Sequence, residues 1–185
     1  MTGSEYATLV AHYLARRFGS RGLKVYREVR AGKSIIGKNR CLDILCVLDG
    51  TNDAFAIECK FQDSEGTVDE KIPYTLDDLR ALPMQGGIAY AGKGFSQGVQ
   101  HMLNASPLAA YCLPLAGQCE SSPDTRELDH LLAMHFRWWD VLVGKKSPVQ
   151  PPALQPAAPV VDRLVAVDDA DDQPLLIVAP PAETV

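Results

Sequence analysis

Residues 41–61, CLDILCVLDGTNDAFAIECKF, contain two apolar runs separated by a short polar segment, and this stretch decides the fold. The first run, residues 41–49, is almost continuously apolar, which is typical of a buried strand. The segment DGTN at residues 49–52 predicts a turn. The second run, residues 54–61, is rich in apolar and aromatic residues and predicts a further strand. Because the turn is short, the two strands are expected to form an antiparallel hairpin.

The predicted hairpin carries charged side chains where a core would place apolar ones. Side chains alternate between the two faces of a strand, so Glu58 and Lys60 share one face of the second strand. Asp43 lies inside the first strand, where a carboxylate needs a partner or a metal ion. If the hairpin brings Asp43 beside Glu58, the two carboxylates repel each other, and a hard cation such as Mg²⁺ relieves that repulsion.

Further helices and strands are expected on both sides of the hairpin. Periodicity and turn residues predict helices at residues 5–18, 75–82, 95–103 and 125–143, and strands at residues 23–32, 86–92 and 109–115. Ser4 and Thr75 are the expected N-caps of the first two helices, and residues 63–73 are expected to form a loop. This order of elements predicts an α/β domain with a small mixed sheet flanked by helices.

The composition changes after residue 144, so a single domain is predicted at residues 1–144 and a tail at residues 145–185. Residues 147–160, SPVQPPALQPAAPV, are rich in proline and alanine and predict an extended linker. Residues 161–185 combine acidic residues with two short apolar runs, and little stable structure is expected there. The apolar runs are candidates for docking on the domain or on a protein partner.

The bulk composition predicts a globular protein without membrane segments. No apolar run approaches the roughly 20 residues that cross a bilayer, and the N-terminus lacks the pattern of a secretory signal. A cytoplasmic location, in a bacterium or in a virus-infected host cell, is therefore expected. The 5 cysteines include no CxxC pair, so reduced and mostly buried thiols are expected rather than a zinc or iron–sulfur site.

The motif in the hairpin resembles that of the PD-(D/E)XK nuclease superfamily. The resemblance rests on Asp43, on Glu58-Cys59-Lys60 fifteen residues later, and on a preceding helix that carries Glu5, and it covers roughly residues 5–115. It implies a restriction-endonuclease-like core in which Asp43, Glu58 and the backbone carbonyl of Cys59 ligate Mg²⁺ or Mn²⁺. It further implies that Lys60 supports the attacking water and that Glu5 lies beside the metal. An acid in a first helical turn is also explained by the helix dipole.

The sequence departs from the superfamily pattern in three ways, and the last two argue against two of its branches. Leu42 stands where many members have proline. No glutamine follows the second predicted helix at the position used by RecB-like exonucleases, and the cysteines do not form the four-cysteine set of the iron–sulfur branch. The resemblance therefore leaves Holliday-junction resolvases, VRR-type nucleases and restriction-like endonucleases open.

Basic residues are concentrated near the motif. Residues 1–50 hold 9 Lys/Arg and 4 Asp/Glu, although the whole chain has a net charge of −5. Such an asymmetry suits a local phosphate-binding face, and the alternative is an ordinary solvated surface. The candidate phosphate contacts are Lys33, Lys38, Arg40 and Lys71, although Lys71 is also explained as a solvated loop lysine.

These observations lead to the expectation of a metal-dependent endonuclease that hydrolyses DNA phosphodiester bonds. Two copies are expected to pair, since enzymes that cut both strands often combine two sites. One alternative is a catalytically inactive nucleic-acid-binding or assembly protein that keeps the fold. Another is a structural protein in which Asp43 and Lys60 form an internal salt bridge, because a D…ExK pattern alone is frequent in α/β proteins.

Overall fold

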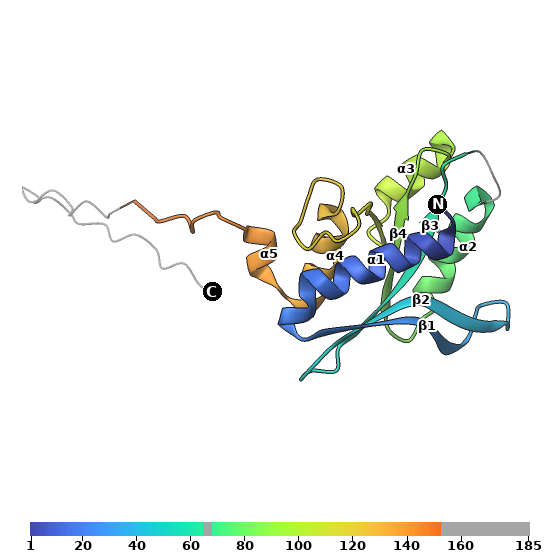
Figure 1. The fold of residues 1–185 in the computed structure, drawn as a ribbon, viewed down its shortest axis with the longest axis horizontal. Helices are drawn as coiled ribbons and strands as arrows, with labels where there is room; N and C mark the ends of the chain where they lie inside the picture. Colours follow the sequence, from blue (N-terminus) through green and yellow to red (C-terminus); the bar gives the residue numbers. More distant parts are fainter. Residues whose placement is uncertain (65–67, 153–185) are drawn as a thin grey trace, which may run out of the picture. The chain divides into compact units, whose positions relative to one another are not determined.

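The structure of this chain is a computed structural model that describes residues 1–64 and 68–152. At its centre is a five-stranded sheet in the order β1-β2-β3-β4-β5 (Figure 1). The strands are β1 (Leu23–Lys33), β2 (Asn39–Leu48), β3 (Ala54–Phe61), β4 (Gln85–Ala91) and β5 (Ala109–Tyr111). The helices are α1 (Gly3–Phe18), α2 (Val68–Arg80), α3 (Gln97–Ala105), α4 (Arg126–Phe136) and α5 (Trp139–Val143), with a short 3₁₀ turn, η1 (Gly19–Arg21), after α1.

The sheet is mixed, as the sequence predicted. Strands β1, β2 and β3 pair in antiparallel fashion, and β3, β4 and β5 pair in parallel. The predicted hairpin is confirmed, with Ile44 opposite Ile57 and Val47 opposite Ala54. Parallel neighbours need a crossover connection, and α2 and α3 lie in the two crossovers.

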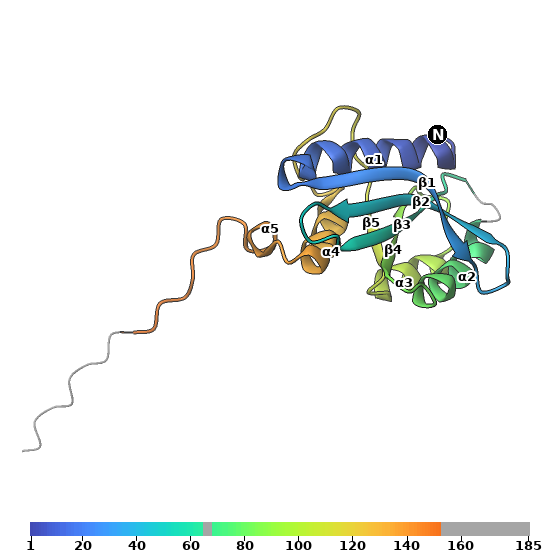
Figure 2. The same cartoon turned by 90° about the horizontal axis from the view of Figure 1, so that it is seen from below.

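Helices cover both faces of the sheet, with α1 on one side and α2 and α3 on the other (Figure 2). On the first face, side chains of α1 and α4 pack with Ile44, Ile57 and Cys59 of the central strands. On the second face, side chains of α2 and α3 pack with Ile88 and Tyr90 of β4. These elements belong to one compact unit, Met1–Lys146. The expected tail, residues 145–185, lies mostly outside the described residues.

The first helix begins earlier than predicted. Thr2, and not Ser4, is its N-cap: the Thr2 hydroxyl accepts the N–H of Glu5, and the Glu5 carboxylate accepts the N–H of Thr2 at 2.7 Å. This reciprocal capping box satisfies two backbone donors that the helix would otherwise leave free. The structure therefore gives Glu5 a capping role at the start of α1.

The second helix differs most from the prediction. It starts at Val68, so part of the expected loop is helical, and Thr75 lies buried inside it with its hydroxyl donating to the Lys71 carbonyl. Pro73 within the helix disguised the pattern, because proline lacks the N–H of a regular helical residue. The apolar stripe that fixes α2 on the sheet is Ile72, Leu76 and Leu79.

The predicted helix at residues 125–143 is broken into α4 and α5. Arg137 takes a left-handed conformation with φ 60° and ends α4. The break turns Trp138 onto two aromatic rings, with centroids 4.8 Å from Phe18 and 4.9 Å from Phe136. Stacking of three aromatic rings therefore outweighs the helical periodicity of the sequence.

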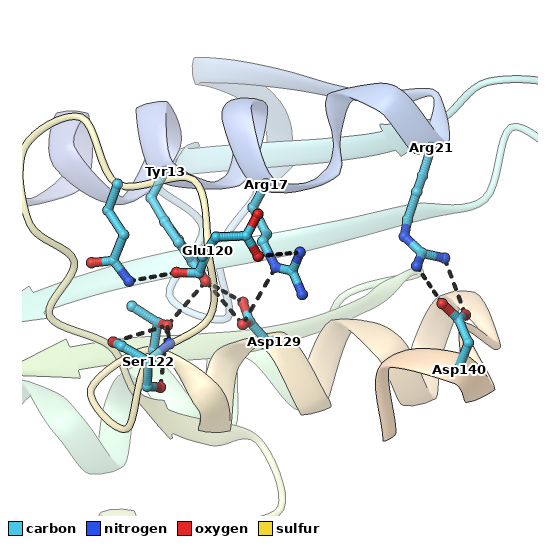
Figure 3. A network of polar contacts seen from close by, with 9 residues as sticks. Tyr13, Arg17, Arg21, Glu120, Ser122, Asp129 and Asp140 are labelled. Atoms are coloured by element: carbon cyan, nitrogen blue, oxygen red, sulfur yellow. Dashed lines mark hydrogen bonds and ion pairs between the residues drawn. The ribbon is translucent and has the colours of Figure 1, made fainter. Parts of the chain in front are cut away.

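A buried polar network joins α1 to the segment around α4 (Figure 3). The Tyr13 hydroxyl lies 2.9 Å from both carboxylate oxygens of Asp129 and 3.0 Å from the Thr125 hydroxyl. Burial raises the pKa of Asp129, whose side chain is fully enclosed. Nearby, Arg21 and Asp140 form an ion pair that ties the end of η1 to α5. Across the described residues, no helix has the length and apolar character that crossing a bilayer requires.

Candidate active site

Asp43 lies where β2 and β3 separate. The pairing of these strands ends at Ile44 and Ile57, while β3 continues beside β4 as far as Phe61. One residue beyond Ile44, the Asp43 carboxylate accepts the N–H of Cys59 at 2.8 Å. The side chain thus takes the place of a backbone acceptor and is held against β3 by this bond.

Glu58 and Lys60 lie on the face of the sheet that α2 and α3 cover. In the parallel register they pair with Ile88 and Tyr90, which belong to the core cluster of that face. The Lys60 ammonium lies 3.2 Å from the Glu58 carboxylate, and each side chain is 18% exposed. Strand alternation places the intervening Cys59 side chain in the opposite cluster. The charged pair therefore lies at the floor of an accessible site and is not sealed inside the core.

The environment of Glu58 disfavours its ionised form. Burial is the largest of the effects that raise the pKa of Glu58 to about 7; the Lys60 ammonium lowers this pKa, and the charges of Asp43 and Asp78 add to the increase. The influence of Asp43 on Glu58 follows from the hairpin register, because one step beyond the Ile44–Ile57 pair brings the two acids opposite each other on one face. Partial burial and mutual repulsion both disfavour the ionised forms of these two carboxylates. A cation bound between them would offset both effects.

The donor atoms at this point fit a hard divalent cation. Asp43 and Glu58 supply carboxylate oxygens. The Cys59 carbonyl is directed to the same strand edge as its N–H, which Asp43 contacts. Within residues 1–64 and 68–152, no set of three His, Cys, Asp or Glu side chains is grouped to hold a metal. Asp43, Glu58 and the Cys59 carbonyl would together form an all-oxygen donor set, which is the kind that suits Mg²⁺ or Mn²⁺.

A cavity of about 560 Å³ opens beside the charged pair. One wall is the loop between β1 and β2, and the other is α2. The residues that line it are Ser34, Ile36, Lys38, Asn39, Arg40, Cys41, Glu58, Lys60, Lys71, Tyr74, Thr75 and Asp78. The α2 residues among them recur at helical spacing and form one face of that helix.

Two of the predicted phosphate contacts line this cavity with exposed side chains, and two have other surroundings. Lys38 and Lys71 lie on opposite walls of the cavity. Arg40 also lines the cavity, but it is buried and forms an ion pair with Asp78 at 2.7 Å. Lys33 lies at the end of β1 and donates to the side chain of Asn39 at 2.8 Å. Lys38 and Lys71 are therefore the cations best placed to meet a phosphate.

The structure does not bring Glu5 together with Asp43 and Glu58 in a metal-binding group. Its carboxylate is exposed and engaged with Thr2, and the Thr2 backbone N–H lowers the pKa of Glu5. The resemblance had placed an acid of the first helix beside the metal. In this chain that acid serves the helix end, so we leave it out of the candidate site.

Three residues that shape the cavity, Ile36, Tyr74 and Asp78, are not among the site residues predicted from the sequence. The signal for Tyr74 and Asp78 was their spacing from Lys71, which puts all three on one helical face. That signal was lost because the predicted helix began at residue 75. Ile36 lies in the turn between β1 and β2, where no helical or strand repeat tells which way a side chain points.

A mixed sheet between helices, with two carboxylates and a lysine where two strands separate, defines the restriction-endonuclease-like class of nuclease domains. A family model described as a PD-(D/E)XK nuclease superfamily domain matches residues 2–139. The chain therefore belongs to the PD-(D/E)XK nuclease superfamily, which confirms the resemblance and the fold class expected from the sequence.

Two solved structures are similar to part of the chain. One is a protein of unknown function, with 19% identity, a TM-score of 0.37, and coverage of 53% of this chain and 53% of that one. The other is a repair endonuclease from Pyrococcus abyssi, with 17% identity, a TM-score of 0.34, and coverage of 55% of this chain and 44% of that one. The alignments thus span about half the length of those proteins. No curated protein matches the chain.

Proposed function

We propose that this nuclease domain hydrolyses DNA phosphodiester bonds in a reaction that depends on Mg²⁺ or Mn²⁺. The ligands in this proposal are Asp43, Glu58 and the Cys59 carbonyl. The observation that carries it is the bond from the Cys59 N–H to Asp43, which fixes one carboxylate at the edge of β3 beside the Glu58–Lys60 pair. The superfamily supports nuclease activity, while DNA as the substrate and the choice of metal are parts of the proposal.

Each charged group at the site has a role in this reaction. A bound divalent cation lowers the pKa of a water ligand and neutralises charge on the phosphate. Lys60 orients the attacking water and places a positive charge where negative charge grows on the phosphate. Its Glu58 partner holds the ammonium at the floor of the cavity. Lys38 and Lys71 contact phosphates on either side of the bond that is cut.

Cleavage within a strand, rather than from an end, is also part of the proposal. Circular single-stranded DNA tests it, because an enzyme that needs an end leaves the circle intact. Pairing of two copies stays a prediction, which the mass of the protein in solution checks.

The proposal is tested with purified protein and labelled single-stranded, duplex, flapped and four-way DNA, each with Mg²⁺, with Mn²⁺ or with EDTA. We expect cleavage in either metal, none in EDTA, and none by Lys60→Ala. The matched control is Lys24→Ala, which removes an exposed β1 lysine paired with Asp49 and should cut like the wild type. Cleavage by Lys60→Ala at the wild-type rate contradicts the assignment. DNA binding by the wild type without any metal-dependent cleavage would select the catalytically inactive alternative.

A further inference from the structure

The two walls of the cavity beside Glu58 and Lys60 have matching chemistry. The β1–β2 loop contributes Ile36 and Lys38, and α2 contributes Tyr74 and Lys71. Each wall thus offers one large apolar side chain and one cation. Ile36 is 60% exposed and Tyr74 is 36% exposed. Large apolar side chains left accessible in a hollow, beside charged groups, are typical of a binding site.

The walls are held in place before any ligand binds. Asp78 of α2 accepts the N–H of Ile35 at 2.8 Å, and it accepts two bonds from Arg40, at 2.9 and 2.7 Å. The side chains of Arg40 and Asp78 are only 7% and 16% exposed, so water screens this ion pair little. The tip of the β1–β2 hairpin accordingly lies next to α2 (Figure 2). A pocket whose walls are already ordered loses little conformational entropy on binding.

The size of the cavity distinguishes between kinds of nucleic acid. A volume of about 560 Å³ falls within the roughly 300–1,000 Å³ of pockets that enclose small organic molecules. Such a pocket holds a nucleotide, but it does not enclose a duplex, whose major groove alone is about 12 Å wide. In an intact duplex the bases are stacked and paired, so a base reaches Tyr74 only by being flipped out, which costs a few kcal/mol.

We infer that this cavity binds an unpaired nucleotide of single-stranded DNA. The base stacks on Tyr74 and contacts Ile36, while Lys38 and Lys71 contact the neighbouring phosphates. This inference rests on the proposed function, because it names the substrate class of the same site. It adds that single strands, and unpaired segments beside a duplex, bind in preference to intact duplex.

The inference is tested by fluorescence anisotropy in a buffer that contains Ca²⁺ in place of Mg²⁺, so that binding is measured without cleavage. The probes are a short oligothymidylate and an abasic strand of the same length, which keeps the phosphates but has no bases. One base stacked on an aromatic side chain corresponds to roughly a 5- to 150-fold change in Kd. We expect a loss in this range for Tyr74→Ala with oligothymidylate, and none for Tyr74→Phe.

The matched control is Tyr26→Ala, which removes another exposed tyrosine, on β1, and should bind like the wild type. The abasic strand should bind the wild type more weakly than oligothymidylate by a similar factor. The abasic strand should have the same affinity for Tyr74→Ala as for the wild type, because a strand without bases has nothing to stack on the Tyr74 ring. Thermal unfolding of Tyr74→Ala and Tyr74→Phe confirms that both variants are folded.

Two results overturn the inference. One is that a relaxed, covalently closed duplex displaces the labelled oligothymidylate probe as well, per nucleotide, as unlabelled oligothymidylate does. The other is equal affinity of the wild type and Tyr74→Ala for oligothymidylate. Failure of the proposed function is seen separately, because it is an absence of cleavage with Mg²⁺ or Mn²⁺ and leaves the affinities measured in Ca²⁺ unchanged.

Discussion

Replacing Glu58 with glutamine tests whether the candidate site holds a carboxylate in an unfavourable environment. Burial raises the pKa of Glu58 from 4.5 to about 7 in the folded chain. A carboxyl group whose pKa is higher in the folded state stabilises the protein when it is protonated. Its contribution is fully present below the unfolded pKa and is lost as the pH rises through the folded one. Glutamine has nearly the same shape and does not titrate, so Glu58→Gln removes this dependence.

The magnitude follows from the shift. One pKa unit corresponds to about 1.36 kcal/mol, so the contribution that is lost well above pH 7 is about 3 kcal/mol. Between about pH 5 and about pH 8 the wild type should lose about 2.5 kcal/mol of unfolding free energy relative to Glu58→Gln. The variant should therefore gain in relative stability at the higher pH, and under the proposed function it should lose cleavage.

Urea unfolding in the presence of EDTA, followed by circular dichroism at both pH values, measures this difference. The matched control is Glu70→Gln, the same chemical change at an exposed position of α2, which should follow the wild type. If the difference in unfolding free energy between Glu58→Gln and the wild type is the same at both pH values, Glu58 is not held in the environment described.

Three further predictions concern other parts of the domain. Mg²⁺ at about 100 times its Kd should stabilise the wild type by about 2.7 kcal/mol in thermal unfolding, and Asp43→Asn should lose that increase; an equal increase in both removes Asp43 from the metal site. Tyr13→Phe should lower the unfolding free energy by about 1–3 kcal/mol, since it removes a donor to the buried Asp129. It should leave cleavage unchanged, and a variant as stable as the wild type would contradict the role of that network. Asp78→Ala leaves Arg40 buried without its partner and should cost about 3 kcal/mol. It should also speed proteolysis in the β1–β2 loop, and unchanged stability would show that the loop is not held by this ion pair.

The central part of the site could be predicted because its signals are local. The turn at residues 49–52 fixed the hairpin, and strand alternation put Glu58 and Lys60 on one face. The acid at Asp43 was conspicuous because the other residues of the run 41–48 are all apolar or cysteine. Each of these inferences needs only the two-residue period of a strand and a short turn.

The walls of the site could not be predicted because they depend on contacts between distant segments. Arg40 was expected to meet phosphate, but Asp78, 38 residues further along the chain, binds it instead. The start of α2 was hidden by Pro73, so Tyr74 was not placed on the face that lines the cavity. For Glu5, the sequence fitted two explanations, an acid beside the metal and an acid at the start of a helix. The structure supports the second, because the Glu5 carboxylate accepts the Thr2 N–H within the first helical turn.

The claim that Asp43 and Glu58 share one divalent cation is tested most directly by measuring Mn²⁺ binding with electron paramagnetic resonance. Free and protein-bound Mn²⁺ give different signals. We predict that the wild type binds Mn²⁺, and that Asp43→Asn and Glu58→Gln each lose that binding while remaining folded. Binding by both variants with the wild-type affinity would contradict the claim that these two carboxylates share one cation.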